Sequence, residues 1–227
     1  MPSPDPRRAR TLAALVAAAV LLSGGPALAA DAAAAPDTAE LDAAASSVVD
    51  GDPGKLIDTA AQAMLQLLDI HREAYRKDPR LVDRLVDRIL LPHFDTDYSA
   101  RLVLGRHWND ATPEQRRRFQ DAFYHSLLGN YGSALLEFTA DRLKVLPFRG
   151  DASAPNATVR TQVRKHDGTE VSVNYTLRHA GSGWKAWDVV IEGISYVKSF
   201  RDDFGAEIDQ KGLDAVNARL EAQAQRK

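Results

Sequence analysis

Residues 159–191 read VRTQVRKHDGTEVSVNYTLRHAGSGWKAWDVVI, and apolar and polar side chains alternate along them in three successive runs. His166-Asp167-Gly168 separates the first two runs and residues 180–183 separate the last two; both segments are typical of hairpin turns. A shorter run of the same period precedes them at 143–147. The pattern predicts an antiparallel meander with one apolar face, which other elements must cover.

Helical periodicity of apolar residues lies on both sides of these strands. We expect helices over 54–77, from Asp78-Pro79 onward, over 96–104, from Thr112 to about Phe138, over 194–208 and over 213–220. Thr112-Pro113-Glu114-Gln115 is a capping box with proline at the first helical position, and residues 116–118, all arginine, are expected on a solvated face. The sequence predicts an α+β fold: an antiparallel four- to five-stranded sheet covered by helices, with flanking helical elements.

Composition excludes several classes of protein. The chain has 227 residues, with 29 Lys and Arg against 31 Asp and Glu, so it lacks the net positive charge of a strongly basic nucleic-acid binder. It has no cysteine, which excludes disulfides, thiolate metal sites, a cysteine nucleophile and a lipid-anchor cysteine. Its 44% hydrophobic content is enough for a packed core.

The first 29 residues are typical of a secretory signal peptide. Arg7, Arg8 and Arg10 precede an uncharged run at 11–22, and Ala27-Leu28-Ala29 provides a cleavage site of small residues. The run is too short for a membrane anchor, because spanning a bilayer takes about 20 apolar residues. We expect four parts: a signal peptide cleaved near Ala29, a flexible lead-in over 30–54, one α+β domain over 55–222 and a tail over 223–227.

Candidate catalytic and metal-binding residues are few. His93, Asp95 and Asp97 are spaced at period two, but Asp95 and Thr96 are better interpreted as caps of the next helix. Phosphate-binding, dinucleotide-binding and serine-nucleophile motifs are absent from the sequence. We predict no metal, no cofactor and no catalytic residue.

Asp188 is the one carboxylate that the pattern places between apolar neighbours within a strand. Near Tyr175 it could act as a base with a raised pKa. The simpler interpretation is an outward Asp188 paired to a Lys or Arg on a neighbouring strand.

Aromatic residues are unevenly placed, since all but Tyr75 lie at Phe94 or later. They fall in the predicted amphipathic helix, the sheet and the helix after it. A curved sheet capped by long helices readily leaves an apolar cavity between its layers. The pattern by itself does not distinguish a filled core from a hollow one.

Five motifs together resemble the MlaC family of periplasmic phospholipid-binding proteins, also called the toluene-tolerance family. They are LVLGRHW at 102–108, ATPEQR at 111–116, YGSAL at 131–135, WKAWDVVIEGIS at 184–195 and KGLD at 211–214. The resemblance covers about residues 55–222. It implies a helix-covered sheet like that of nuclear transport factor (NTF2-like), no catalytic residues, and a soluble periplasmic carrier, expected as a monomer. Its partners would be phospholipid, an outer-membrane lipoprotein complex and the substrate-capturing domain of an inner-membrane ABC transporter.

A carrier of this kind has to shelter the acyl chains of its lipid. A two-chain lipid exposes about 30 methylenes at about 0.8 kcal/mol each, so on the order of 24 kcal/mol must be offset by a dry cavity. We predict that this cavity is lined by apolar residues of the helices, the sheet and the helix after it: Leu104, Trp108, Phe119, Phe123, Leu127, Tyr131, Val145, Val163, Val173, Tyr175, Leu177, Trp187, Val189, Ile191, Ile194, Val197 and Phe200. The alternatives are another apolar lipid such as a hopanoid, a small NTF2-like enzyme that uses Asp188, and a purely structural domain with a solid core.

Overall fold

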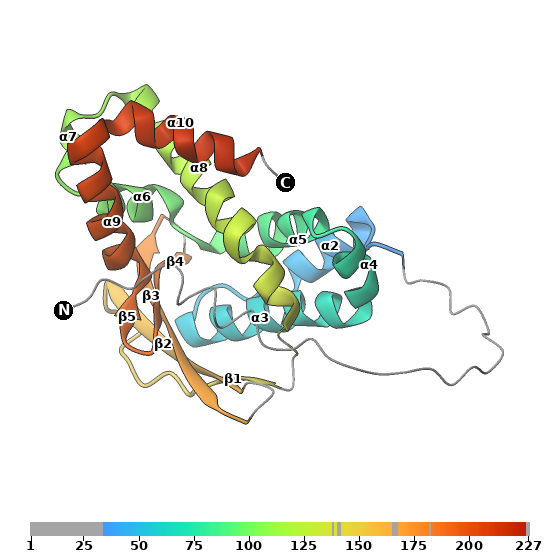
Figure 1. Cartoon of the computed structure of the whole chain (residues 1–227). Helices are drawn as coiled ribbons and strands as arrows, with labels where there is room; N and C mark the ends of the chain where they lie inside the picture. The colour runs from blue at the N-terminus through green and yellow to red at the C-terminus, as the bar shows by residue number, and fades with distance from the viewer. Residues whose placement is uncertain (1–33, 138, 140–141, 165–167, 182, 226–227) are drawn as a thin grey trace.

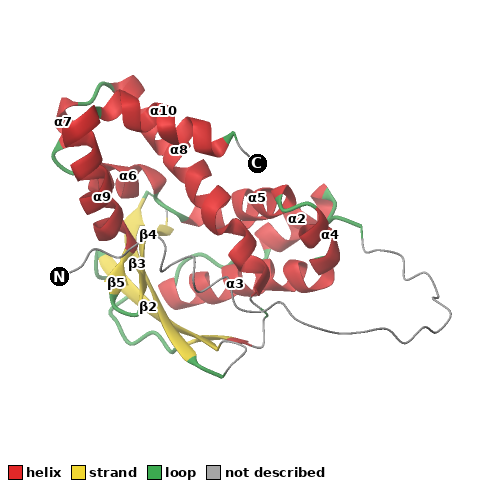
Figure 2. Cartoon of the chain, in the orientation of Figure 1, coloured by secondary structure: helices red, strands yellow, loops and turns green. Residues whose placement is uncertain are grey.

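The structure is a computed structural model that describes residues 34–137, 139, 142–164, 168–181 and 183–225. The predicted signal peptide and two residues of the predicted turn, His166 and Asp167, therefore lie outside the described residues. Helices and strands follow the predicted order along the chain, with helices before and after a central meander of strands (Figures 1 and 2).

The sheet has five strands in the order β1-β2-β3-β4-β5, and every neighbouring pair is antiparallel. The predicted α+β class is confirmed, and the strand count is at the upper end of the predicted range. A bulge interrupts the register between β3 and β4 at Thr176/Leu177. The strand bounds are β1 Leu143–Val145, β2 Asn156–Arg164, β3 Glu170–Ala180, β4 Gly183–Ile191 and β5 Ile194–Ser195.

The helices form an N-terminal group and a C-terminal group, and the long helix α8 contributes side chains to both (Figure 1). The first group contains α2 Thr38–Ser46, α3 Pro53–Ile70, α4 Arg72–Lys77, α5 Arg80–Leu85 and the helical turns Val86–Leu90 and Leu91–His93. Then follow α6 Thr96–Leu104, α7 His107–Asp110, α8 Pro113–Tyr131 and the turn Gly132–Glu137. After the sheet come α9 Tyr196–Lys211 and α10 Leu213–Ala224, which pack with α6 and α8.

Buried side chains form three clusters rather than one core. The N-terminal cluster joins α3, α4 and α5 around Leu68, Tyr75 and Leu85. The C-terminal cluster joins α6, α8, α9 and α10, and the sheet cluster joins α3 to β2, β3 and β4. The C-terminal cluster includes Leu104, Phe119, Phe123, Phe204, Val216 and Leu220, and the sheet cluster includes Leu56, Ile57, Val159, Leu177, Trp184 and Ala186.

Two predicted helices end earlier than their apolar period suggests. The helix expected over 54–77 is divided at His71, whose φ of −107° and ψ of 23° separate α3 from α4. Its ring Nδ1 lies 2.6 Å from the Ala34 carbonyl oxygen, so a contact distant in sequence favours the break. The helix from Thr112 ends at Tyr131 rather than near Phe138, and a tighter helical turn follows it.

The predicted flexible lead-in contains a packed helix, α2. The Asp37 carboxylate accepts from the Glu40 amide at 2.8 Å, and Glu40 accepts from the Asp37 amide at 3.0 Å, which completes a capping box. Leu41 and Ala44 pack against the N-terminal cluster. The alanine-rich composition suggested an unpacked segment, but small side chains also allow a helix to approach its neighbours closely.

The start of α8 confirms the predicted capping box, with Thr112 and Gln115 bonded reciprocally at 2.9 and 3.1 Å. Two of the three arginines at 116–118, which were expected on a solvated face, also make specific contacts. Arg116 donates to the Trp108 carbonyl at 2.8 Å, and its guanidinium lies 4.7 Å from the centre of the Trp108 ring. Arg118 binds both carboxylate oxygens of Glu221, at 2.8 and 3.0 Å, and thereby ties α8 to α10.

Candidate functional site

Half of the apolar face of the sheet belongs to none of the three clusters. The register pairs Val163 with Val171, Val173 with Ile191 and Ile191 with Ile194, so these side chains are contiguous on one face. Together with Val189, which pairs with Tyr175, we call these residues the apolar strip: Val163, Val171, Val173, Val189, Ile191 and Ile194.

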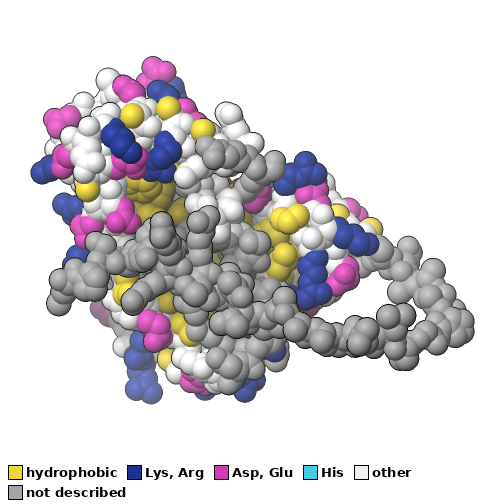
Figure 3. Space-filling model, viewed as in Figure 1, with side chains coloured by type: hydrophobic (Ala, Val, Ile, Leu, Met, Phe, Trp, Pro, Cys, Tyr) yellow, Lys and Arg dark blue, Asp and Glu magenta, His cyan; other side chains and the backbone are white. Residues whose placement is uncertain are grey.

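The apolar strip is only partly covered by the rest of the chain. Val163 is 7% exposed, but Val171, Val173, Val189 and Ile191 are half-buried, and Ile194 is 51% exposed. Figure 3 shows hydrophobic side chains on the surface beneath the group formed by α8, α9 and α10. A contiguous apolar surface that water still reaches is a candidate binding face.

The other half of the same face is filled. Leu177 is fully buried beneath α3, with Leu56 and Ile57, and Val145 and Tyr175 pack against this sheet cluster. Burial raises the pKa of the Tyr175 hydroxyl. The residues of this half therefore pack the sheet against α3.

Most of the helical residues predicted to line the cavity pack against one another instead. The Phe119 and Phe123 rings stack at 5.5 Å, and Phe200 meets the Phe123 ring edge-on at 5.1 Å. Leu104 is 1% exposed in the same cluster. Trp108, Leu127 and Val197 pack at its border. The side chain of Tyr131 lies outside the described residues.

Trp187 differs from the other sheet residues of the predicted lining. It lies next to the bulge, meets Tyr98 of α6 edge-on at 5.5 Å, and its carbonyl accepts from the Ser99 hydroxyl at 2.6 Å. The predicted residues therefore form two separate groups, one in the C-terminal cluster and one on the sheet. Val171 is a member of the strip that the prediction omitted, although its alternation with Ser172 and Asn174 indicated the same face.

Among the described residues, Asp188 is bonded to the start of α9 rather than to a Lys or Arg of a neighbouring strand. It is 5% exposed and accepts from the Ser195 hydroxyl at 2.6 Å and from the Val197 amide at 3.0 Å. These contacts fix the first turn of α9 on β4, so Asp188 is a buried helix anchor. Tyr175 pairs with Val189, the next residue, and therefore points to the opposite face of the sheet.

The interpretation of Asp95 as a cap is confirmed. It accepts from the Tyr98 amide at 3.0 Å and from Arg178 Nε at 2.7 Å. Burial lowers the pKa of His93. Across the described part of the chain, no three His, Asp or Glu side chains are grouped so that they could hold a metal ion.

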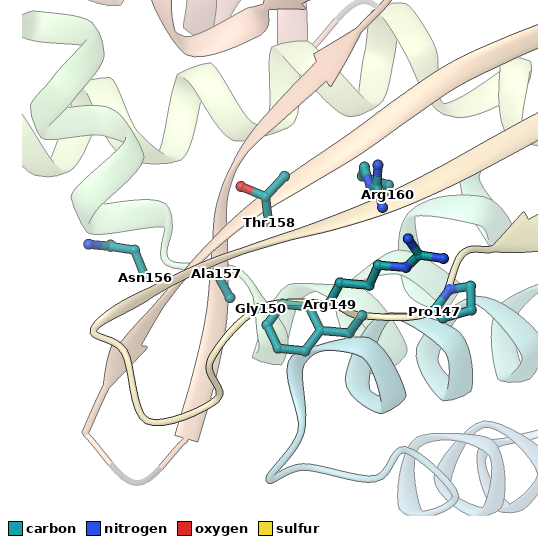
Figure 4. A pocket seen from close by; sticks show the side chains of 8 residues that line it. Pro147, Arg149, Gly150, Asn156, Ala157, Thr158 and Arg160 are labelled. Carbon is teal, nitrogen blue, oxygen red and sulfur yellow. The ribbon is translucent and has the colours of Figure 1, made fainter.

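Two of the surface pockets in the described part of the chain are bordered by residues outside the apolar strip. One, of about 290 Å³, lies between β2 and the loop at 147–150 (Figure 4), and the other, of about 230 Å³, lies between α8 and α10. Neither is bordered by a residue of the predicted lining. Within the described ranges, every helix is too short or too polar to cross a membrane.

The fold and the partly open strip together define an α+β protein with a face suited to an apolar ligand. The family model described as "MlaC protein" matches residues 58–222, and the chain belongs to this family. It is 33% identical to the toluene tolerance protein ttg2D of Pseudomonas putida over 163 residues, which are 71% of this chain and 75% of that protein.

Two further relatives extend the comparison. The chain is 22% identical to the intermembrane phospholipid transport system binding protein MlaC of Haemophilus influenzae, over 79% of this chain and 85% of that protein. A phospholipid-binding protein from Ralstonia solanacearum, solved in complex with a phospholipid, superposes with a TM-score of 0.71 at 26% identity. That match covers 77% of this chain and 97% of the other.

Proposed function

We propose that this protein is a phospholipid carrier and that the acyl chains of its lipid lie along the apolar strip. The observation that carries the proposal is the position of the strip: a continuous row of Val and Ile side chains on a sheet whose other half is tightly covered. Membership of the MlaC family and the likeness to a structure with bound phospholipid support it.

The chemistry of the strip suits acyl chains rather than a polar ligand. Val173, Val189 and Ile191 offer methyl groups in a row, and the neighbouring Thr161 hydroxyl is bonded to the Val173 carbonyl at 2.7 Å. A saturated chain laid on this surface removes apolar area from water on both partners. The lipid headgroup then stays in water, so the acyl chains set selectivity.

From the predicted lining, the proposal keeps the members of the apolar strip together with Val197 and Phe200, and it assigns packing roles to the other described residues. Phe119, Phe123 and Leu104 form the solid core that positions α9. Val197 and Phe200, at the border of that core, lie in the part of α9 that follows Ile194 and Asp188. They border the lipid in this scheme, whereas the fully buried Phe119 does not contact it.

The cellular setting is part of the same proposal. The protein is exported to the periplasm through its N-terminal segment, and it moves lipid between an outer-membrane lipoprotein complex and the substrate-capturing domain of an inner-membrane ABC transporter. The signal-peptide pattern of residues 1–29 and the family support this setting. Asp188, held as a helix anchor, has no part in it as a catalytic base.

Native mass spectrometry of protein purified without detergent tests the cargo. We expect phospholipid to leave the wild-type protein, and a polycyclic lipid in its place would favour the hopanoid alternative. Val173→Trp should reduce the bound lipid at least tenfold, because the indole fills the middle of the strip. Ile70→Trp is the matched control, since Ile70 is 55% exposed on α3. A folded Val173→Trp protein with unchanged lipid content would refute the assignment of the strip.

A further inference from the structure

Basic side chains gather on the opposite side of the sheet, over β1 and β2. Lys144 pairs across the ladder with Gln162, and Arg160 and Arg164 flank Gln162 on the same face of β2. Arg149, in the loop after β1, borders the same 290 Å³ pocket as Arg160 (Figure 4). All four cations are exposed. We call them the basic surface.

The loop that carries Arg149 is anchored rather than free. Its neighbour Phe148 packs against the sheet cluster, and a Cβ atom on Gly150 would come within 2.5 Å of the Phe148 ring. A Cβ atom on Gly54 of α3 would lie 3.0 Å from Phe148 Cβ. The Leu146 amide donates to the Arg160 carbonyl at 2.9 Å. Arg149 is therefore held beside the edge of β2.

The positive charge of the basic surface is largely uncompensated. Among the described residues, the ion pairs of the structure involve other basic side chains and none of these four. Glu170 lies opposite Arg164 in the register. The Asp151 carboxylate keeps its negative charge and is hydrogen-bonded to Ser153, at 2.8 Å from its amide and 2.7 Å from its hydroxyl, rather than paired with one of the four cations among the described residues. This cationic surface belongs to a chain whose net charge is −2.

We propose that the basic surface docks the protein onto the anionic phospholipid surface of a membrane. A sheet face presents its cations over an extended area, which matches the plane of a bilayer. The exposed large hydrophobic residues of the described chain are Val49, Ile70 and Ile194, and none of them lies on this surface. The contact is therefore electrostatic, made with headgroups and without insertion, so it is weak, reversible and sensitive to salt.

This inference goes beyond the proposed cargo, because it concerns the opposite side of the same strands. Arg160 lies between Val159 and Thr161, and successive residues of a strand point to opposite faces. A bilayer that contacts the basic surface leaves the apolar strip turned away from it. Docking then concentrates the carrier at the membrane while its lipid stays outside the contact.

Vesicle co-sedimentation tests the proposal with two compositions: phosphatidylcholine alone, and phosphatidylcholine mixed with phosphatidylglycerol. We expect binding to the anionic vesicles at low salt, little binding to the neutral ones, and loss of binding at high salt. Arg149→Gln with Arg160→Gln should weaken the vesicle partition coefficient by about 25-fold, at about fivefold for each cation near an anionic surface. Both side chains are exposed, so the fold should persist, as a thermal melt will check.

The control removes the same charge elsewhere, by Lys77→Gln with Arg117→Gln, two exposed residues of α4 and α8. Equal weakening by the control pair, or unchanged binding of the Arg149 and Arg160 double variant, would overturn the proposal. So would equal binding to both kinds of vesicle, or none at low salt. The double variant should still release lipid in native mass spectrometry, which separates this proposal from that of the cargo.

Discussion

Removing the Asp188 carboxylate should weaken the contact between α9 and the sheet and lower the free energy of unfolding by several kcal/mol. The side chain is buried and accepts hydrogen bonds from the Ser195 hydroxyl and the Val197 amide. Hydrogen bonds to a charged group contribute about 1.5–3 kcal/mol each, and an amide left without a partner adds to the loss. Asp188→Ala should therefore lower the free energy of unfolding by about 3–5 kcal/mol.

The isosteric change Asp188→Asn should cost less, about 1–2 kcal/mol. The amide oxygen can still accept from the Val197 amide, and the new NH₂ group can donate to the Ser195 oxygen, which also accepts from the Lys198 amide at 3.1 Å. For a domain of this size each kcal/mol shifts Tm by roughly 2–4 °C, so Asp188→Ala should lower Tm by roughly 10 °C and Asp188→Asn by about 4 °C.

Thermal unfolding followed by circular dichroism, with lipid content measured in parallel, checks both values. Asp110→Ala, at an exposed position of α7, is the control and should stay within about 0.5 kcal/mol of the wild type. An Asp188→Ala protein as stable as the wild type would contradict the anchoring role. Loss of turnover of an apolar substrate in a fully stable Asp188→Asn protein would instead establish the catalytic alternative.

Three further substitutions test local features of the fold. Gly105 ends α6 with φ of 54° and ψ of −120°, a conformation that is strained for any residue with a Cβ atom. Gly105→Ala should therefore lower the free energy of unfolding by about 1–3 kcal/mol. An unchanged Tm would contradict this backbone strain. Bonding to Arg219 holds the pKa of Glu207 below its ordinary value of 4.5; the resulting stabilisation is present above that value and is lost as pH falls through the folded pKa. Glu207→Gln should therefore be less stable than wild type by about 1 kcal/mol at pH 7, and the difference in stability should shrink in thermal melts at acid pH. A difference that does not depend on pH would contradict the ion pair between Glu207 and Arg219. Asp37→Ala removes the α2 cap at a cost of about 1 kcal/mol, which should appear as faster amide exchange in α2 and nowhere else.

Sequence periodicity predicts the sheet well because its signal is local. The alternation from Val159 to Ile191 needs only neighbouring residues to specify faces, and the structure confirms an antiparallel sheet in chain order. Capping chemistry is equally local, so the start of α8 follows Thr112 as expected, and α3 likewise begins after a capping residue, Asp52. The family resemblance is confirmed by the match over residues 58–222.

Features that depend on distant partners could not be predicted from the pattern. Asp188 is a helix anchor because α9 returns to β4, and nothing beside Asp188 in the sequence specifies that contact. Periodicity showed that Phe119 and Phe123 share a face of α8, but not that α9 and α10 would cover that face. The bulge at Thr176/Leu177 places Trp187 against α6, where a regular ladder predicts it beside the strip.

The buried apolar residues lie where helices cover them, whereas most residues of the apolar strip remain partly exposed. Phe119 of α8 is fully buried among side chains of α6, α9 and α10, so a guest could reach it only by displacing protein. The sheet is closed by α3 over Leu177 and Trp184, which are both almost completely buried. Beyond Tyr175 the same face continues for two more register pairs, and none of the clusters that the described residues form covers it. An acyl chain bound there would cover the part of the apolar face that the described residues leave partly exposed. It could dissociate without unfolding the buried clusters on either side.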